Sequence, residues 1–338
     1  MYNTNSRYRW YILTLSMLTH GTIAGLLRLC MPVLFKQISE DLGLNLTEIG
    51  AIWGMDPLAG VFIGLPAGLI ADRFGIRRTL VVVCILAGIF SALRGFSINF
   101  ITLATAMFLF GFVAAALPSI IPKTTTQWFS KQQLGLTNAL INVSFGVGAM
   151  TATMFSATVF SPFLGSWKNL MFVYGAPPVI LGFLWLFTAR EPDAKEPESY
   201  IENVLPFRQA LSEVVHIKEV WFIGLISMAF WGASMGYNGY LPLYLRNIGW
   251  TPVYADSVIT GLMGVTALGT IPMVLLSNRL KSRKAVLFMS ILTMVINLAL
   301  LPFANGAAVW ALVIIGGFIR AGTSALFNII IFEIKGLG

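Results

Sequence analysis

Arg320 lies near the middle of the last run of apolar residues, where a charge needs a partner. Placing an arginine at that depth in a membrane costs about 2.5–3.5 kcal/mol on insertion scales. Its guanidinium stays protonated, and its planar fork matches the geometry of a carboxylate or an oxyanion. The acid at the most comparable depth, Glu333, is more than three helical turns away. We therefore predict that Arg320 contacts an anionic substrate.

Arg28 and Asp56 lie at comparable depths in the first and second apolar runs. Three interpretations remain open at this point. Arg28 can bind an anion, the two residues can form a structural ion pair, or Asp56 can carry a proton. Burial would favour the protonated carboxyl at Asp56, whereas a neighbouring arginine would favour the charged form.

The composition excludes several classes of protein. Only 11% of the 338 residues are charged and the mean hydropathy is +0.80, whereas soluble domains carry about 25% charged residues. The net charge of +8 does not indicate nucleic acid, because the basic residues fill short gaps between apolar runs. His20 and His216 are the only histidines, and no metal-ligand spacing, phosphate loop or nucleophile pattern is present. We predict a monomer in a lipid bilayer that is no enzyme and holds no metal or cofactor.

The apolar runs predict an all-α polytopic bundle, since roughly 20 apolar residues cross the hydrocarbon as a helix. The first run shows no cleavage site, which indicates a retained anchor helix. A Pro- and Glu-rich connection at 190–219 separates a six-helix part, 1–189, from a four-helix part, 220–338. Ten spans are predicted, at 10–35, 47–71, 78–95, 100–122, 134–160, 169–189, 220–245, 254–277, 284–303 and 306–332.

The basic residues predict the orientation. With a cytoplasmic N-terminus, sixteen lysines and arginines lie on the cytoplasmic side and four on the other. This bias matches the positive-inside rule. The four on the outer side are Lys36, Arg94, Lys168 and Arg246.

The two parts also resemble each other in sequence. The segment 72–78 recurs at 278–284 and the segment 111–114 recurs at 317–320, both at an offset of 206. The segment 32–38 recurs at 242–248, at an offset of 210. Parallel repeats of this kind are typical of transporters that rock two bundles around a site near the midplane of the membrane.

The loop between the second and third predicted helices carries a family pattern. The run from Gly68 to Arg78 has a glycine, three residues, Asp72 and Arg73, one residue, Gly75, and then basic residues. This pattern resembles the corresponding loop of the major facilitator superfamily. The resemblance implies two six-helix halves, with the second half here incomplete. Two copies at an offset of 206 predict roughly 410 residues, so about 70 are expected to be missing.

The resemblance implies two sets of functional residues. The loop would act as a gate latch, and Gly68 would let another helix approach closely. The alternative is that the arginines of the loop serve only to set the orientation of the helices in the membrane. The predicted latch comprises Gly68, Asp72, Arg73, Gly75, Arg77 and Arg78. Lys123, in contrast, is assigned mainly to topology. Since the first, fourth, seventh and tenth helices line the cavity in this family, an anion site is predicted from Arg28, Tyr237, Asn238, Tyr240 and Arg320.

The function implied is secondary active transport of a small organic or inorganic anion, with proton coupling through Asp56. Arg28 is similar to the first-helix arginine of cyanate-porter-like, nitrate-porter-like and organic-anion members. The expected location is a plasma (inner) membrane. A drug or sugar transporter is the alternative, although the fifth predicted helix lacks the Gly-Pro pattern of antiporters. A membrane receptor or enzyme is an alternative from another class.

Overall fold

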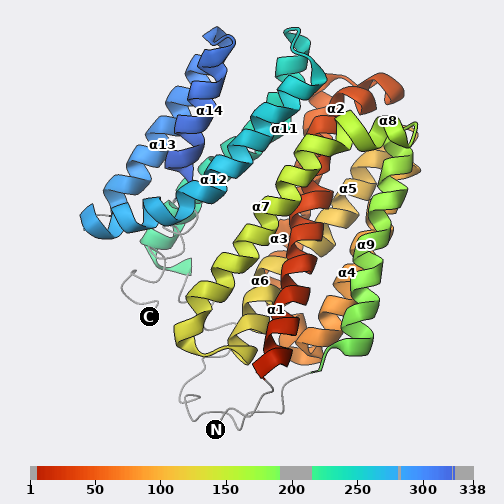
Figure 1. Ribbon diagram of the computed structural model, residues 1–338, viewed down its shortest axis with the longest axis vertical. Coiled ribbons are helices and arrows are strands. Elements are labelled where there is room, and N and C mark those ends of the chain that lie inside the picture. Colours follow the sequence, from red (N-terminus) through yellow and green to blue (C-terminus); the bar gives the residue numbers. More distant parts are fainter. Residues whose placement is uncertain (1–5, 191–214, 281–282, 322, 324–338) are drawn as a thin grey trace. The chain divides into compact units, whose positions relative to one another are not determined.

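The computed structural model describes residues 6–190, 215–280, 283–321 and 323 (Figure 1). The regular structure of these residues is helical. The chain forms two compact units. One comprises Met1–Ala194 with Gly239–Thr260, and the other Lys195–Asn238 with Gly261–Gly338.

The first unit is built from long apolar helices and their interrupted continuations. The first predicted span is a continuous helical path in which a π-helical turn, η1, joins two α-helices. The helices are α1 (Ser6–His20), η1 (Gly21–Leu27), α2 (Arg28–Leu42), α3 (Leu46–Phe74), α4 (Ile76–Gly95), α5 (Phe100–Ala114), α6 (Leu117–Trp128), η2 (Lys131–Gln133), α7 (Leu134–Phe155), η3 (Ser156–Phe160), α8 (Ser161–Phe163) and α9 (Trp167–Thr188).

Glycines let neighbouring helices of this unit approach closely, as is common in membrane bundles. A Cβ on Gly148 of α7 would overlap the backbone of Gly21 in η1. A Cβ on Gly88 of α4 would overlap the carbonyl of Gly175 in α9, and the reverse also holds. The packing of these helices therefore requires glycine at the points of contact.

The π-helical turn η1 ends directly before Arg28, and Pro32 follows within α2. A π-helical turn and a proline both interrupt regular helical hydrogen bonding. The carbonyl of Leu27, at the end of this turn, accepts a hydrogen bond of 2.8 Å from Nη1 of Arg94. The fully buried Arg94 side chain therefore adds a hydrogen bond where the regular bonding of the first helical path is interrupted.

The second unit contains the larger part of two helices and two shorter ones. The helices are α11 (Lys218–Asn247), α12 (Pro252–Leu280), α13 (Arg283–Leu300), η4 (Leu301–Phe303) and α14 (Ala307–Arg320). Phe230 of α11 packs with Met294 of α13, and Met273 of α12 packs with Val286 and Ala321. The last residues of α11 and the first residues of α12 belong to the first unit.

The first nine predicted spans coincide with described helical paths, and the described part of the tenth is also helical, which confirms the all-α multi-span fold. Eight of these paths are long and apolar enough to cross a membrane. The other two are α12, with 29 residues, and α14, whose described part is only 14 residues long. The residues after 323 lie outside the described part.

The contacts inside each unit repeat at the offset that the sequence indicated. A Cβ on Gly111 of α5 would overlap the backbone of Asp56 in α3. At an offset of 206, a Cβ on Gly317 of α14 would overlap Leu262 in α12. The corresponding helix pairs, α3 with α5 and α12 with α14, therefore make contact at corresponding glycines.

Candidate functional site

Arg28 and Asp56 form a two-point ion pair within the first unit. Nε of Arg28 lies 2.6 Å from Oδ2 of Asp56, and Nη2 donates to Oδ1 at 2.9 Å. The carboxylate side chain is 1% exposed and the arginine side chain 25% exposed. Of the three interpretations of these residues, the structural ion pair is the one that predicted this contact. A substrate role for Arg28 and a proton-carrying role for Asp56 stay predictions.

Arg94 adds a second positive charge near this pair. Asp56 and Arg28 are among its charged neighbours, and its guanidinium lies 3.8 Å from the ring centre of Phe110. Within the described part of the chain, its Nε and Nη2 atoms are buried and have no hydrogen-bond partner. The sequence analysis counted Arg94 among the four basic residues of the outer side, and the structure adds that its side chain is completely buried.

Arg320 lines a small pocket within the second unit. The pocket holds about 20 Å³ of free space, and its other polar side chains are Tyr237 of α11 and Asn297 of α13. Gly316 and Gly317, which precede Arg320 on α14, also line it. The free space fits roughly one water molecule. A ligand of several heavy atoms therefore needs the pocket to widen.

The Arg320 guanidinium has no counter-charge in the described residues. The four ion pairs found there involve Arg28, Lys123, Lys168 and Arg246. Tyr237 is its one electrostatic neighbour among them. Glu333, the nearest acid by sequence, lies outside the described residues. The prediction that Arg320 meets an anion remains open.

The remaining residues of the predicted anion site are not among those that line this pocket. Tyr240 belongs to the first unit, where its hydroxyl donates to the carbonyl of Leu46 at 2.9 Å. Asn238 belongs to the second unit, and its Oδ1 is buried without a partner among described residues. The shared site of Arg28, Asn238 and Arg320 stays a prediction.

Asp72 of the predicted latch pairs with Lys123 of α6. The Lys123 ammonium lies 2.6 Å from Oδ1 of Asp72 and donates to the carbonyl of Gly68 at 2.9 Å. The sequence analysis assigned Lys123 mainly to topology and missed this contact. The expected close helix approach at Gly68 is absent from the described residues, because a Cβ there would meet only Lys123, at 3.6 Å.

The other latch residues lie around the turn between α3 and α4. Gly75 adopts a φ of +87°, which favours glycine. Arg77 donates to the carbonyls of Trp185 and Leu186 at the end of α9. Arg73 lies over the ring of Phe74. The gating role of this loop stays a prediction.

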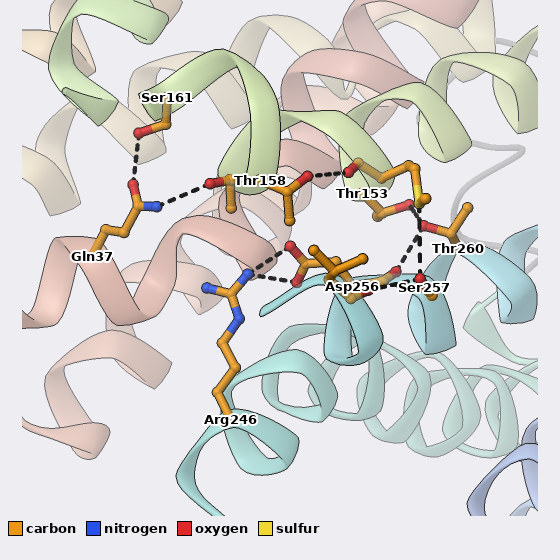
Figure 2. Close-up of polar contacts among 11 residues, drawn as sticks. Gln37, Thr153, Thr158, Ser161, Arg246, Asp256, Ser257 and Thr260 are labelled. Atoms are coloured by element: carbon orange, nitrogen blue, oxygen red, sulfur yellow. Dashed lines mark hydrogen bonds and ion pairs between the residues drawn. The ribbon is translucent and has the colours of Figure 1, made fainter. Parts of the chain in front are cut away.

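A buried ion pair that the sequence analysis missed joins α11 to α12 in the first unit (Figure 2). Nη2 of Arg246 lies 2.6 Å from both carboxylate oxygens of Asp256. Beside them, the hydroxyls of Thr153 and Thr260 lie 2.9 Å apart. Arg246 was counted only for topology. The signal for the pair was an acid ten residues after the arginine, across the turn at Gly249.

The profile of the Major Facilitator Superfamily matches residues 14–336, so the chain belongs to this superfamily of transporters. It is 25% identical over 202 residues to the probable galactarate/D-glucarate transporter GudP of Escherichia coli, covering 56% of this chain and 42% of that protein. It is 24% identical over 260 residues to the hexuronate transporter of Escherichia coli, covering 71% and 58%.

A third relative is the probable nitrate/nitrite antiporter NarK1 of Thermus thermophilus, 25% identical over 248 residues, covering 69% of this chain and 53% of that protein. The chain thus spans about half the length of these curated relatives.

Among solved structures, a bacterial homologue of the human lysosomal transporter Spinster matches with a TM-score of 0.74 and 18% identity, covering 97% of this chain and 80% of that one. The nucleoside transporter NupG also matches, with a TM-score of 0.72, 15% identity and coverage of 97% and 83%. These likenesses show the fold.

Proposed function

We propose that this protein moves a small organic or inorganic anion across a membrane by alternating access, and that Arg320 binds the anionic group. The observation that carries the proposal is a permanently charged guanidinium in a pocket without a carboxylate among the described residues. Such a charge within a membrane bundle normally faces a partner or a water-filled cavity. An anionic substrate supplies the missing partner.

The names of the relatives support an anion. Galactarate, D-glucarate and hexuronates are carboxylates at neutral pH, and nitrate and nitrite are oxyanions. Another relative, from Pseudomonas aeruginosa, is named a 4-hydroxybenzoate transporter and is 25% identical over 226 residues. Carboxylates and oxyanions share the planar oxygen geometry that an arginine fork binds at two points.

Proton coupling through Asp56 is part of the proposal. In the described structure both oxygens of Asp56 are held by Arg28. An anion that draws Arg28 away leaves this carboxylate free to take up a proton.

A location in an inner membrane with a cytoplasmic N-terminus also belongs to the proposal, supported by the distribution of basic residues.

Binding to purified variants of the full chain tests the anion site. The probes are D-glucarate, D-glucuronate, 4-hydroxybenzoate and nitrate, measured by calorimetry on monodisperse protein. We expect Arg320→Gln to weaken binding about ten- to a hundredfold, since a hydrogen bond to a charged group contributes about 1.5–3 kcal/mol. Arg320→Lys should also weaken it, because a point charge cannot form two parallel hydrogen bonds.

The matched control is Arg279→Gln, which removes an exposed arginine of the same unit. This variant should bind the probes as the unmodified protein does. Unchanged affinity in Arg320→Gln would contradict the proposal. Binding of an uncharged sugar or a cationic drug, with no anion bound, would favour the drug or sugar alternative.

A further inference from the structure

Asn297 of α13 is a buried amide that uses only one side of its hydrogen-bonding capacity. Its side chain is 7% exposed, and its Nδ2 donates to the carbonyl of Thr293, one turn earlier, at 2.9 Å. Its Oδ1 has no donor within the described part of the chain. The bond to Thr293 fixes which side of the amide carries the free acceptor, because a carbonyl accepts only from the nitrogen.

Asn297 lines the same pocket as Arg320. The Asn297 amide rests against Gly316 of α14, where a Cβ would come within 2.9 Å of Oδ1. Gly316 precedes Arg320 by four residues, so both lie on one face of α14. Helical side chains lean toward the N-terminus, which carries the Arg320 side chain over the turn of Gly316. Arg320 and the asparagine that carries the vacant acceptor therefore line one pocket.

Leaving this acceptor empty would be unfavourable, because a buried polar atom without a partner costs about 1–3 kcal/mol. The free space of about 20 Å³ is enough for one water, which can donate to Oδ1 when no substrate is bound. A ligand that displaces this water must supply a donor in its place or lose affinity. Nitrate and unsubstituted carboxylates have no such donor.

We propose that Asn297 is a specificity-determining residue that accepts a hydrogen bond from a hydroxyl group of the transported anion. The substrate class is then hydroxylated carboxylates, with the carboxylate on Arg320 and a hydroxyl on Asn297. This inference rests on the proposed function of the Arg320 pocket. It adds that the same pocket discriminates against anions without a hydroxyl group.

Matched pairs of anions test the inference on the purified full chain. D-glucarate is compared with adipate, which is the same six-carbon diacid without hydroxyls, and 4-hydroxybenzoate is compared with benzoate. We expect the hydroxylated member of at least one pair to bind about tenfold more tightly, the effect of one buried hydrogen bond. The ratio of the affinity for the hydroxylated acid to the affinity for the plain acid should fall to near one in Asn297→Ala. The affinity for the plain acid itself should stay within about twofold of that of the unmodified protein.

A second variant covers the case in which Asn297→Ala does not fold. Gly316→Ala keeps the asparagine but places a methyl group against its amide, so it should also reduce the ratio. Ser234→Ala is the control, since it removes another buried polar group of this unit that does not line the pocket. It should keep the ratio of the unmodified protein.

The possible results separate this inference from the proposed function. Equal affinities within both pairs, or an unchanged ratio in Asn297→Ala and Gly316→Ala, would overturn the role of Asn297 and leave anion binding in place. Binding of nitrate without binding of any of the four acids would overturn the role of Asn297 alone. Unchanged anion binding in Arg320→Gln would overturn both. If the affinity ratio falls to near one in Asn297→Ala, and Arg320→Gln weakens the binding of both members of a pair, the role of Asn297 and the proposed function are both supported.

Discussion

Arginines inside the two units differ in whether they have a carboxylate. Arg28 and Arg246 each contact both oxygens of an aspartate, at distances of 2.6–2.9 Å. Arg94 and Arg320 have no such partner among the described residues. Removing one member of a buried pair leaves an uncompensated charge, which costs more than the pair itself contributes. The two paired arginines therefore have a counter-charge in the described structure, whereas the charge of Arg320 is available to a ligand.

The Arg28–Asp56 pair makes a prediction at this scale. Asp56→Asn should lower the free energy of unfolding of the purified protein by about 3 kcal/mol. This value is the low end of the range for breaking a buried pair, because Arg28 is partly exposed. Thermal unfolding in detergent measures the loss. The double variant Arg28→Met with Asp56→Asn should recover part of it, since no unpaired charge remains. Additive losses in the double variant would show that the two residues do not stabilise one another.

Some glycines in the helices of the first unit lie where two backbones meet, and others have open space around them. In α7, Gly148 lies against Gly21 of η1, whereas a Cβ added at Gly135 would have no atom within 4 Å. The two glycines thus have the same helical backbone and opposite surroundings. This difference separates the packing effect of a methyl group from its effect on helix propensity.

Gly148→Ala should therefore destabilise the protein strongly, because the added methyl group overlaps the Gly21 backbone and must push α7 away from η1. The expected loss is about 1–3 kcal/mol in thermal unfolding, as for an overpacked core. Gly135→Ala is the matched control and should be neutral or stabilising by up to about 1 kcal/mol. A stable Gly148→Ala variant would show that the two helices do not pack as described.

The orientation of the whole molecule can be tested with single cysteines in intact cells. Cys30 and Cys84 are buried and can be replaced first. With a cytoplasmic N-terminus, a cysteine at Ser199, in the 190–219 connection, should not react with an impermeant reagent from outside, whereas Ile98→Cys should. Ile98 is the better reporter of the α4–α5 turn, because it is exposed while its neighbour Ser97 is buried. Labelling of the connection alone would reverse the orientation.

The helical architecture can be predicted from the amino-acid sequence. Apolar runs of sufficient length leave a helix as the stable backbone in hydrocarbon, so nine spans and the described part of the tenth could be predicted from the apolar runs. The offset of 206 and the Gly68–Arg78 pattern likewise can be read directly along the chain. The depths of Arg28 and Asp56 were enough to raise their pairing as one of three interpretations, since depth can be counted along each helix.

The contacts between polar groups, in contrast, could not be predicted without the packing of the helices. Lys123 reaches Asp72, Arg94 reaches Leu27, and Asn297 lies against Gly316, each from a different helix. These partners depend on which faces two helices turn toward each other, and a run that is apolar all round carries no periodic signal for its inward face. Depth along a helix can be read from the sequence, whereas its rotation is set by packing against its neighbours.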